Sequence, residues 1–180
     1  MILRMMLDRN TLRHQSHSFR NRPAMYVISR ALECDASDIM ALQKLAYQSE
    51  AHLYNDWSIP PLVQTIESLH QEFATSVVLK AVVGNHIVGS VRAMCTGGTC
   101  KIGRLAVMPQ SQRQGIGSAL LQSIEAAFPL AEVFELFTGS LSEANIRFYR
   151  RHGYAVTRTE RMSPSVSLVF MQKPGSPVVR

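Results

Sequence analysis

The chain has 180 residues and a mass of 20.1 kDa, which fits a single domain. Apolar residues make up 46% and charged residues 18%, which excludes a wholly disordered chain, and no apolar run approaches the roughly 18 residues of a membrane span. Three cysteines without Cys-x-x-Cys spacing favour reduced thiols in a soluble, cytoplasmic protein over a secreted disulfide framework.

The basic character of the chain is concentrated in residues 1–24. This segment holds five arginines and one aspartate, a net charge of +4, so the rest of the chain carries only +2 of the total +6. A transit peptide or a nucleic-acid-binding arm would have this composition. We expect instead an unstructured extension in front of Met25, because chain termini are commonly disordered unless they are tied down.

From Met25 onward, hydrophobic periodicity predicts the elements in chain order. Asp35 and the residues after it are typical of a helix start, Pro60-Pro61 opens a second helix, and Gly84-Asn85 is typical of a hairpin turn. The expected elements are strand 26–32, helices 36–53 and 60–73, strands 77–83, 87–91 and 102–108, helix 115–128, strand 133–137, helix 142–151, and strands 154–159 and 166–172. This order predicts a mixed α/β domain over residues 25–174, with a largely antiparallel central sheet flanked by helices, and a short tail at 175–180.

The segment Gln112-Arg113-Gln114-Gly115-Ile116-Gly117 carries the strongest chemical signal. It lies between a predicted strand and the start of a predicted helix, where backbone N–H groups lack partners and the helix dipole favours anions. It matches neither G-x-x-x-x-G-K-[ST] nor G-x-G-x-x-G. The alternative reading is a glycine-rich helix start that only permits tight packing.

Two linked motifs resemble a known family. Leu105-Ala106-Val107-x-Pro109, followed by Gln112-x-x-Gly115-x-Gly117, is similar to the acetyl-CoA-binding core of the GNAT superfamily of N-acetyltransferases. Downstream, the stretch 142–154 resembles the family's segment with an asparagine, a helical tyrosine, and a glycine followed by an aromatic residue. The resemblance extends over about residues 26–173 and implies a GNAT-like acyl-CoA N-acyltransferase fold.

The resemblance implies acetyl-CoA as co-substrate. No metal is expected, because no His, Cys or Asp spacing in the sequence resembles a metal site. The strand before the turn would splay from its neighbour, so that the backbone of Leu105, Ala106 and Val107 pairs with the pantetheine arm and one N–H stabilises the oxyanion. Residues 112–117 would hold the pyrophosphate. Asn145 would hydrogen-bond the pantetheine. Tyr149, a phenol with an ordinary pKa near 10, would donate a proton to the departing thiolate and also contact the cofactor.

The general base has two candidates, Glu135 in a predicted strand and Glu50 on the predicted first helix. A water relay and an amine that loses its own proton are further alternatives. An acceptor wall would gather aromatic and acidic residues that suit an amine, namely Tyr47, Glu50, His52, Tyr54 and Trp57.

The sequence therefore predicts an enzyme that moves an acetyl group from acetyl-CoA to a primary amine of a small molecule or a protein, by direct attack in a ternary complex. Two alternatives come from other classes, a non-catalytic acyl-CoA-binding sensor and a nucleic-acid-associated protein that uses the basic arm. Binding to a membrane is not expected and nucleic acid is a minor option. Dimers are frequent in the family.

Overall fold

The computed structural model describes residues 25–163 and 166–175. The expected N-terminal extension 1–24 and all but the first residue of the expected tail 175–180 lie outside the described residues. The elements are β1 (Val27–Arg30), η1 (Glu33–Asp35), α1 (Ala36–Ala46), α2 (Gln48–Tyr54), α3 (Pro60–Val63), α4 (Ile66–Thr75), β2 (Val77–Val83), β3 (His86–Thr96), β4 (Thr99–Val107), η2 (Pro109–Ser111), α5 (Ile116–Ala126), β5 (Val133–Gly139), α6 (Glu143–Arg151), β6 (Ala155–Arg161) and β7 (Ser167–Pro174).

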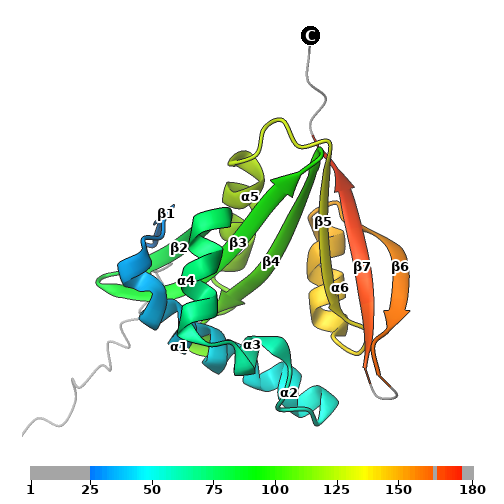
Figure 1. The fold of residues 1–180 in the computed structure, drawn as a ribbon, viewed down its shortest axis with the longest axis horizontal. Helices are drawn as coiled ribbons and strands as arrows, with labels where there is room; N and C mark the ends of the chain where they lie inside the picture. Colours follow the sequence, from blue (N-terminus) through cyan, green and yellow to red (C-terminus); the bar gives the residue numbers. More distant parts are fainter. Residues whose placement is uncertain (1–24, 164–165, 176–180) are drawn as a thin grey trace, which may run out of the picture.

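One seven-stranded sheet organises the described residues, in the order β1-β2-β3-β4-β5-β7-β6 (Figure 1). Every neighbouring pair is antiparallel except β4 and β5, which run parallel. The predicted fold class, a mixed α/β domain with a largely antiparallel sheet, is thereby confirmed. Within the described ranges, no helix combines the length and apolar character that crossing a membrane requires.

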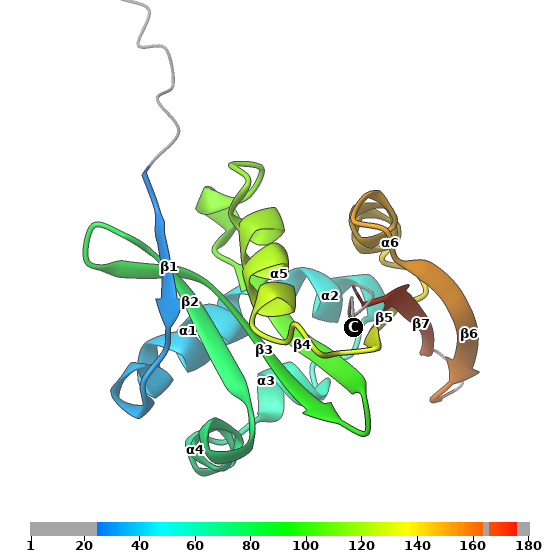
Figure 2. The ribbon, with the colours of Figure 1, turned by 90° about the horizontal axis from the view of Figure 1, so that it is seen from above.

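Helices cover both faces of the sheet (Figure 2). On one face α5 packs its fully buried side chains, Leu120, Leu121 and Ile124, over the central strands. On the other face, α1 and α4 bury a second cluster that includes Ile39 and Leu69. Each fully buried side chain of this kind contributes about 1.5–3 kcal/mol relative to an exposed one. These two clusters fix α5 and α1 to the strands that carry the site.

The two long helices predicted near the N-terminus are each broken, and that part of the prediction is wrong. The first is divided at Tyr47 into α1 and α2, and the second is divided by an extended Gln64 into α3 and α4. Thr65 restarts the helix because its side chain accepts a hydrogen bond from the Ser68 N–H at 3.2 Å. The Gln64 side chain accepts a hydrogen bond from Gln43 and donates one to Glu72, so the break is used to join α1 to α4.

Candidate functional site

The backbones of β4 and β5 diverge, and we call the region between these two strands the wedge. Parallel pairing joins only three positions, from Thr99–Val133 to Lys101–Glu135, although β4 runs on to Val107 and β5 to Gly139. Figure 1 shows the two strands diverging beyond this short ladder. Because a strand edge without a neighbour leaves backbone N–H and C=O groups available, β4 offers a hydrogen-bonding edge to a ligand. The predicted cofactor residues Leu105, Ala106 and Val107 lie on this part of β4.

The turn after β4 presents a series of free backbone N–H groups. Arg113 and Gly115 both have left-handed backbone conformations, with φ of 60° and 83°. Gly115 is the N-cap of α5 and provides no side-chain cap. In the described part of the chain, the N–H groups of residues 113–118 donate no backbone hydrogen bond. Consecutive free N–H groups of this kind, at a helix N-terminus, form an anion-binding concavity.

The side chains around this turn stabilise its conformation and do not occupy its backbone N–H groups. Gln112 donates a hydrogen bond to the Val107 carbonyl at 3.2 Å, and Gln114 donates one to the Gln110 carbonyl at 3.2 Å. Ile116 is buried in the core, so only its backbone faces a ligand. The Arg113 side chain is exposed and can add a positive charge.

The loop that leads from β5 into α6 is joined to α2. Glu50 accepts hydrogen bonds from the Ser142 hydroxyl and from Asn145 Nδ2, the latter at 3.0 Å. Tyr54 Oη accepts a hydrogen bond from the Leu141 N–H at 2.6 Å. The predicted cofactor residue Asn145 therefore shares its amide with the predicted base Glu50, and α2 bridges the open end of the wedge.

Tyr149 lies on α6, packed against the core beside Phe148 and Tyr154. Burial raises the pKa of its phenol well above the usual value, and the neighbouring Tyr47 and Glu50 raise it further. The hydroxyl therefore keeps its proton throughout the physiological range. No hydrogen bond joins it to another described residue, so it is available to a ligand.

Glu135, the other predicted base, lies on β5 where the parallel ladder ends. Its carboxylate accepts hydrogen bonds from Gln172 Nε2 at 2.8 Å and from Arg158 at 3.1 Å. The hydrogen bond from Gln172 has the largest effect on its pKa, which lies below the usual value even though burial opposes the shift. Glu135 is therefore ionised and already partnered. The structure places it at the narrow end of the wedge and Glu50 at the open end.

The predicted acceptor wall separates into two groups. Tyr47, Glu50 and Tyr54 face inward, toward the sheet and α6. His52 and Trp57 are exposed and stack edge to face on each other, with ring centroids 4.8 Å apart. Tyr47 and Glu50 also lie within electrostatic range of Tyr149.

Sequence reasoning missed a group of charged residues on the α1 face of the sheet. Arg92 of β3 forms an ion pair with Glu72 of α4, and Arg104 of β4 lies beside Arg92. Burial lowers the pKa of Arg92 to about 10; Glu72 opposes this shift and the charge of Arg104 adds to it. Tyr47 lies close enough to both arginines for their charges to oppose the rise that burial causes in its pKa. Gly103 before Arg104 was the only sequence signal of an irregular strand here.

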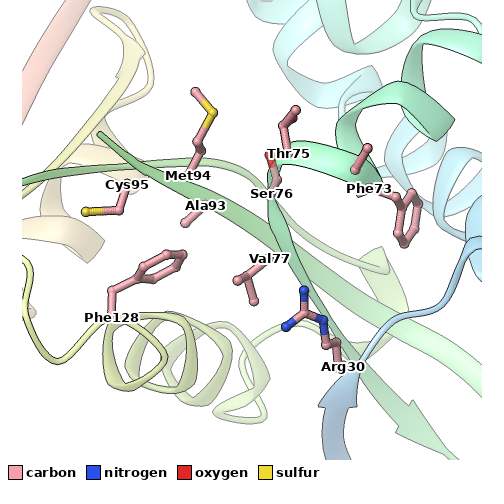
Figure 3. Close-up of a pocket in the computed structure, with 10 residues that line it drawn as sticks. Arg30, Phe73, Thr75, Ser76, Val77, Ala93, Met94, Cys95 and Phe128 are labelled. Carbon is pink, nitrogen blue, oxygen red and sulfur yellow. The ribbon is translucent and has the colours of Figure 1, made fainter. Parts of the chain in front are cut away.

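A hollow of about 230 Å³ lies outside the candidate site, where the end of β3 meets the ends of α4 and α5 (Figure 3). Its lining includes Arg30, Met94, Cys95 and Phe128 and none of the predicted site residues. Across residues 25–163 and 166–175, no group of three His, Cys, Asp or Glu side chains is arranged to hold a metal ion.

The central part of the chain matches a known protein family in sequence. Residues 74–156 match the family described as an acetyltransferase (GNAT) domain. No curated protein matches the chain in sequence.

Solved structures of low sequence identity share the fold. A PaiA N-acetyltransferase from Thermoplasma acidophilum, in complex with coenzyme A, is 16% identical with a TM-score of 0.70, over 83% of this chain and 99% of that one. The ribosomal-protein-S18-alanine N-acetyltransferase from Escherichia coli is 18% identical with a TM-score of 0.69, over 86% and 96%. YncA from Salmonella typhimurium, with its cofactor acetyl-CoA, is 17% identical with a TM-score of 0.67, over 87% and 97%.

Proposed function

Because residues 74–156 match the GNAT acetyltransferase family and the described chain shares the fold of solved GNAT structures, we propose that the protein transfers an acetyl group from acetyl-CoA to a primary amine. The resemblance expected from the two sequence motifs is confirmed at the level of the family. The acceptor, the order of steps and the residue roles are our proposals. We also propose that residues 25–174 form one domain and act in the cytoplasm.

The free edge of β4 beside the anion-binding turn is the observation that carries this function. The turn suits a diphosphate, because residues 113–118 offer several unpartnered N–H groups and Gly115 and Gly117 carry no side chain. The edge of β4 from Leu105 to Val107 suits the amide groups of a pantetheine arm. Bound acetyl-CoA would supply the activated acetyl thioester. The chain would supply Leu105, Ala106 and Val107 along the arm, residues 112–117 around the diphosphate, and Asn145 and Tyr149 from α6.

Tyr149 donates the hydrogen bond that the departing sulfur needs. Its raised pKa keeps the phenol protonated, and its hydroxyl has no competing partner among the described residues. An alkyl thiol has a pKa of about 8.5, below that of this phenol, so complete transfer of the Tyr149 proton to the thiolate is unfavourable. Tyr149 therefore stabilises the thiolate first by a hydrogen bond. In the balanced reaction, the amine loses one proton and the sulfur gains one.

Glu50 suits the role of proton acceptor for the amine better than Glu135 does. It lies in electrostatic range of both Tyr47 and Tyr149, which places it at the open end of the wedge where an amine would enter. The pKa of Glu135 is held below the usual value of a glutamate, chiefly by the hydrogen bond from Gln172, which makes it a weaker base than an ordinary carboxylate. A water held at Glu50 would serve the same purpose.

The positions of the thiols support direct attack by the amine. Cys95 and Cys100 are cross-strand neighbours near the β3–β4 turn, and Cys34 lies in η1. Cys34 and Cys95 are exposed, and Cys100 is buried in the ladder that joins β4 to β5. None is placed to carry an acyl group between the two substrates.

The test is release of free thiol from acetyl-CoA across a panel of amines, with Tyr149→Phe beside the wild type. We expect kcat to fall by about a hundredfold or more in the variant, since positioned proton donors contribute this much, while acetyl-CoA affinity changes little. Tyr154→Phe is the matched control, because it removes the hydroxyl of a neighbouring tyrosine that is bonded to Glu125 at 2.7 Å. An unchanged kcat in Tyr149→Phe removes Tyr149 from the mechanism. Binding of acetyl-CoA without thiol release to any amine would identify a sensor instead of an enzyme.

A further inference from the structure

A bulge in β4 turns Arg104 toward the α1 face of the sheet. Arg92 pairs with Gly103 and Ser90 pairs with Ala106, so two residues of β4 lie opposite the single Val91 of β3. Strict alternation would place Arg104 on the face of Cys100 and Ile102, which lies beneath α5. Arg104 instead has a φ of 52° and lines a cavity on the other face with Gln43 of α1 and Leu69 of α4. Bulges that redirect a side chain in this way are concentrated next to functional sites.

The redirected Arg104 has no counter-charge. Glu72, an acidic residue of α4 on this face, is already paired with Arg92. Arg104 Nε is buried and has no hydrogen-bond partner, and no ion pair or hydrogen bond to another described residue is formed by its guanidinium. Arg104 is only partly buried, but its inaccessible Nε–H lacks an acceptor, so a ligand oxygen that accepts from it removes the cost of an unsatisfied buried donor.

Arg104 directly precedes Leu105 on the free edge of β4, so it adjoins the proposed cofactor site. The cavity beside it has a volume of about 10 Å³, room for one water molecule, so a larger group has to reach Arg104 from its solvent-accessible part. Gly103 faces the same side as its pairing partner Arg92, and a Cβ added at Gly103 would meet no atom within 4 Å. The charge of Arg104 acts on Tyr47, and Tyr47 in turn acts on Tyr149.

Charges of both signs lie near Arg104. Arg92 and Arg104 line the same cavity, and both of them, like Glu50, lie within electrostatic range of Tyr47. A polyamine would bring further positive charge against the two arginines. A molecule with both an ammonium and a carboxylate can place its ammonium near Glu50 and its carboxylate on Arg104. The planar guanidinium binds carboxylates with two parallel hydrogen bonds.

We propose that the acceptor amine carries a carboxylate and that Arg104 binds this carboxylate. The inference rests on the acetyl transfer proposed above and names the substrate class. The carboxylate could belong to a free amino acid or to an acidic side chain of a peptide, and both present the same group to Arg104.

The experiment compares acceptors that differ only in this charge. The pairs are L-alanine with L-alaninamide, β-alanine with β-alaninamide, and the C-terminally amidated dipeptides Ala-Glu and Ala-Gln; spermidine is the acceptor without a carboxylate. For each compound, kcat/KM is measured by thiol release from acetyl-CoA, and the Kd is measured by calorimetry on coenzyme A-loaded protein. The first two pairs test whether the carboxylate of a free amino acid is recognised, and the dipeptides test whether the carboxylate of an acidic side chain is recognised.

We expect the carboxylate of at least one pair to be favoured by about tenfold to a hundredfold, the size of a charge-assisted contact. Arg104→Gln should bring this ratio close to one without changing the Kd of coenzyme A, and Arg104→Lys should retain part of it. Arg30→Gln is the control, because it removes an exposed arginine from β1. Thermal unfolding of each variant verifies that it is folded.

Three results overturn the inference. These are equal binding of every pair, no binding by any member, and a carboxylate preference that survives in Arg104→Gln. A carboxylate preference in calorimetry without any thiol release would leave the Arg104 site standing and refute the proposed acetyl transfer instead.

Discussion

Replacement of Gly115 and Gly117 by alanine separates the fold of the turn from its use by a cofactor. Gly115 has a φ of +83°, where an alanine costs about 1–2 kcal/mol. Its added Cβ would lie 3.7 Å from Tyr26 Oη, so no clash adds to this cost. For a chain of this size, each kcal/mol shifts Tm by about 2–4 °C, so Gly115→Ala should lower Tm by about 2–8 °C.

In the absence of a ligand, Gly117→Ala should not lower Tm, unlike Gly115→Ala. It lies inside α5 without a positive φ, and its added Cβ would make ordinary contacts at 3.7 Å with Phe148 and Val107. Alanine favours helices over glycine by up to about 1 kcal/mol, so Gly117→Ala should leave Tm unchanged or raise it slightly. The protein alone therefore has no need of glycine at this position.

Both variants should weaken coenzyme A, because a methyl group on either residue obstructs the N–H groups of the turn. Loss of one charge-assisted hydrogen bond corresponds to about 1.5–3 kcal/mol, or roughly a tenfold to hundredfold higher Kd. Calorimetric titration with coenzyme A measures this change and differential scanning calorimetry measures Tm. Gly84→Ala is the matched control, since Gly84 has a φ of +59° in the β2–β3 hairpin with open space around it. It should lower Tm as Gly115→Ala does and keep the wild-type Kd. Wild-type affinity in both Gly115→Ala and Gly117→Ala would show that the diphosphate does not bind at this turn.

Three further outcomes are expected. Gly103→Leu should raise the KM of the acceptor at least tenfold and leave the Kd of coenzyme A unchanged, because the leucine side chain enters the open space beside Arg92. An unchanged KM would place the acceptor elsewhere. In native protein, a thiol reagent should modify the exposed Cys34 and Cys95 within minutes and Cys100 only after unfolding, since burial raises the pKa of Cys100 to about 12; three fast thiols would contradict its burial. The pKa of Glu135 is lowered on folding, chiefly by the hydrogen bond from Gln172, so its contribution to stability is present above about pH 4.5 and is lost as the pH falls through its folded value. Glu135→Gln should therefore flatten the decline of unfolding free energy in acid, as measured by urea titration at several pH values, and an equally steep decline would refute that contribution.

Local chemistry predicted much of the fold. Gly84 and the pair Gly97-Gly98 adopt positive φ values in the two hairpin turns, which is the reason that glycine there predicts a turn. The apolar stripe of α5 likewise corresponds to side chains buried against the sheet. These features depend on a few neighbouring residues, and the sequence contains all of the information that they need.

Features that depend on distant partners could not be predicted. Glu50 is bonded to residues more than 90 positions away, and periodicity gives no information about such a contact. Strand β7 lies between β5 and β6, an order that hydrophobic patterns do not specify. Arg104 adopts a left-handed conformation that its residue type disfavours, so the bulge and the arginine pair became visible only in three dimensions.

The contact of α2 with the start of α6 has a thermodynamic consequence. Glu50 and Tyr54 hold the loop from which α6 projects Asn145 and Tyr149 toward the proposed cofactor, while Tyr47 at the start of α2 faces the proposed amine. Any movement of α2 that accompanies occupation of one subsite is transmitted to the other through these hydrogen bonds. The affinities of the two substrates are then coupled by the same factor in both directions, and Glu50→Gln, which weakens this connection, reduces that cooperativity.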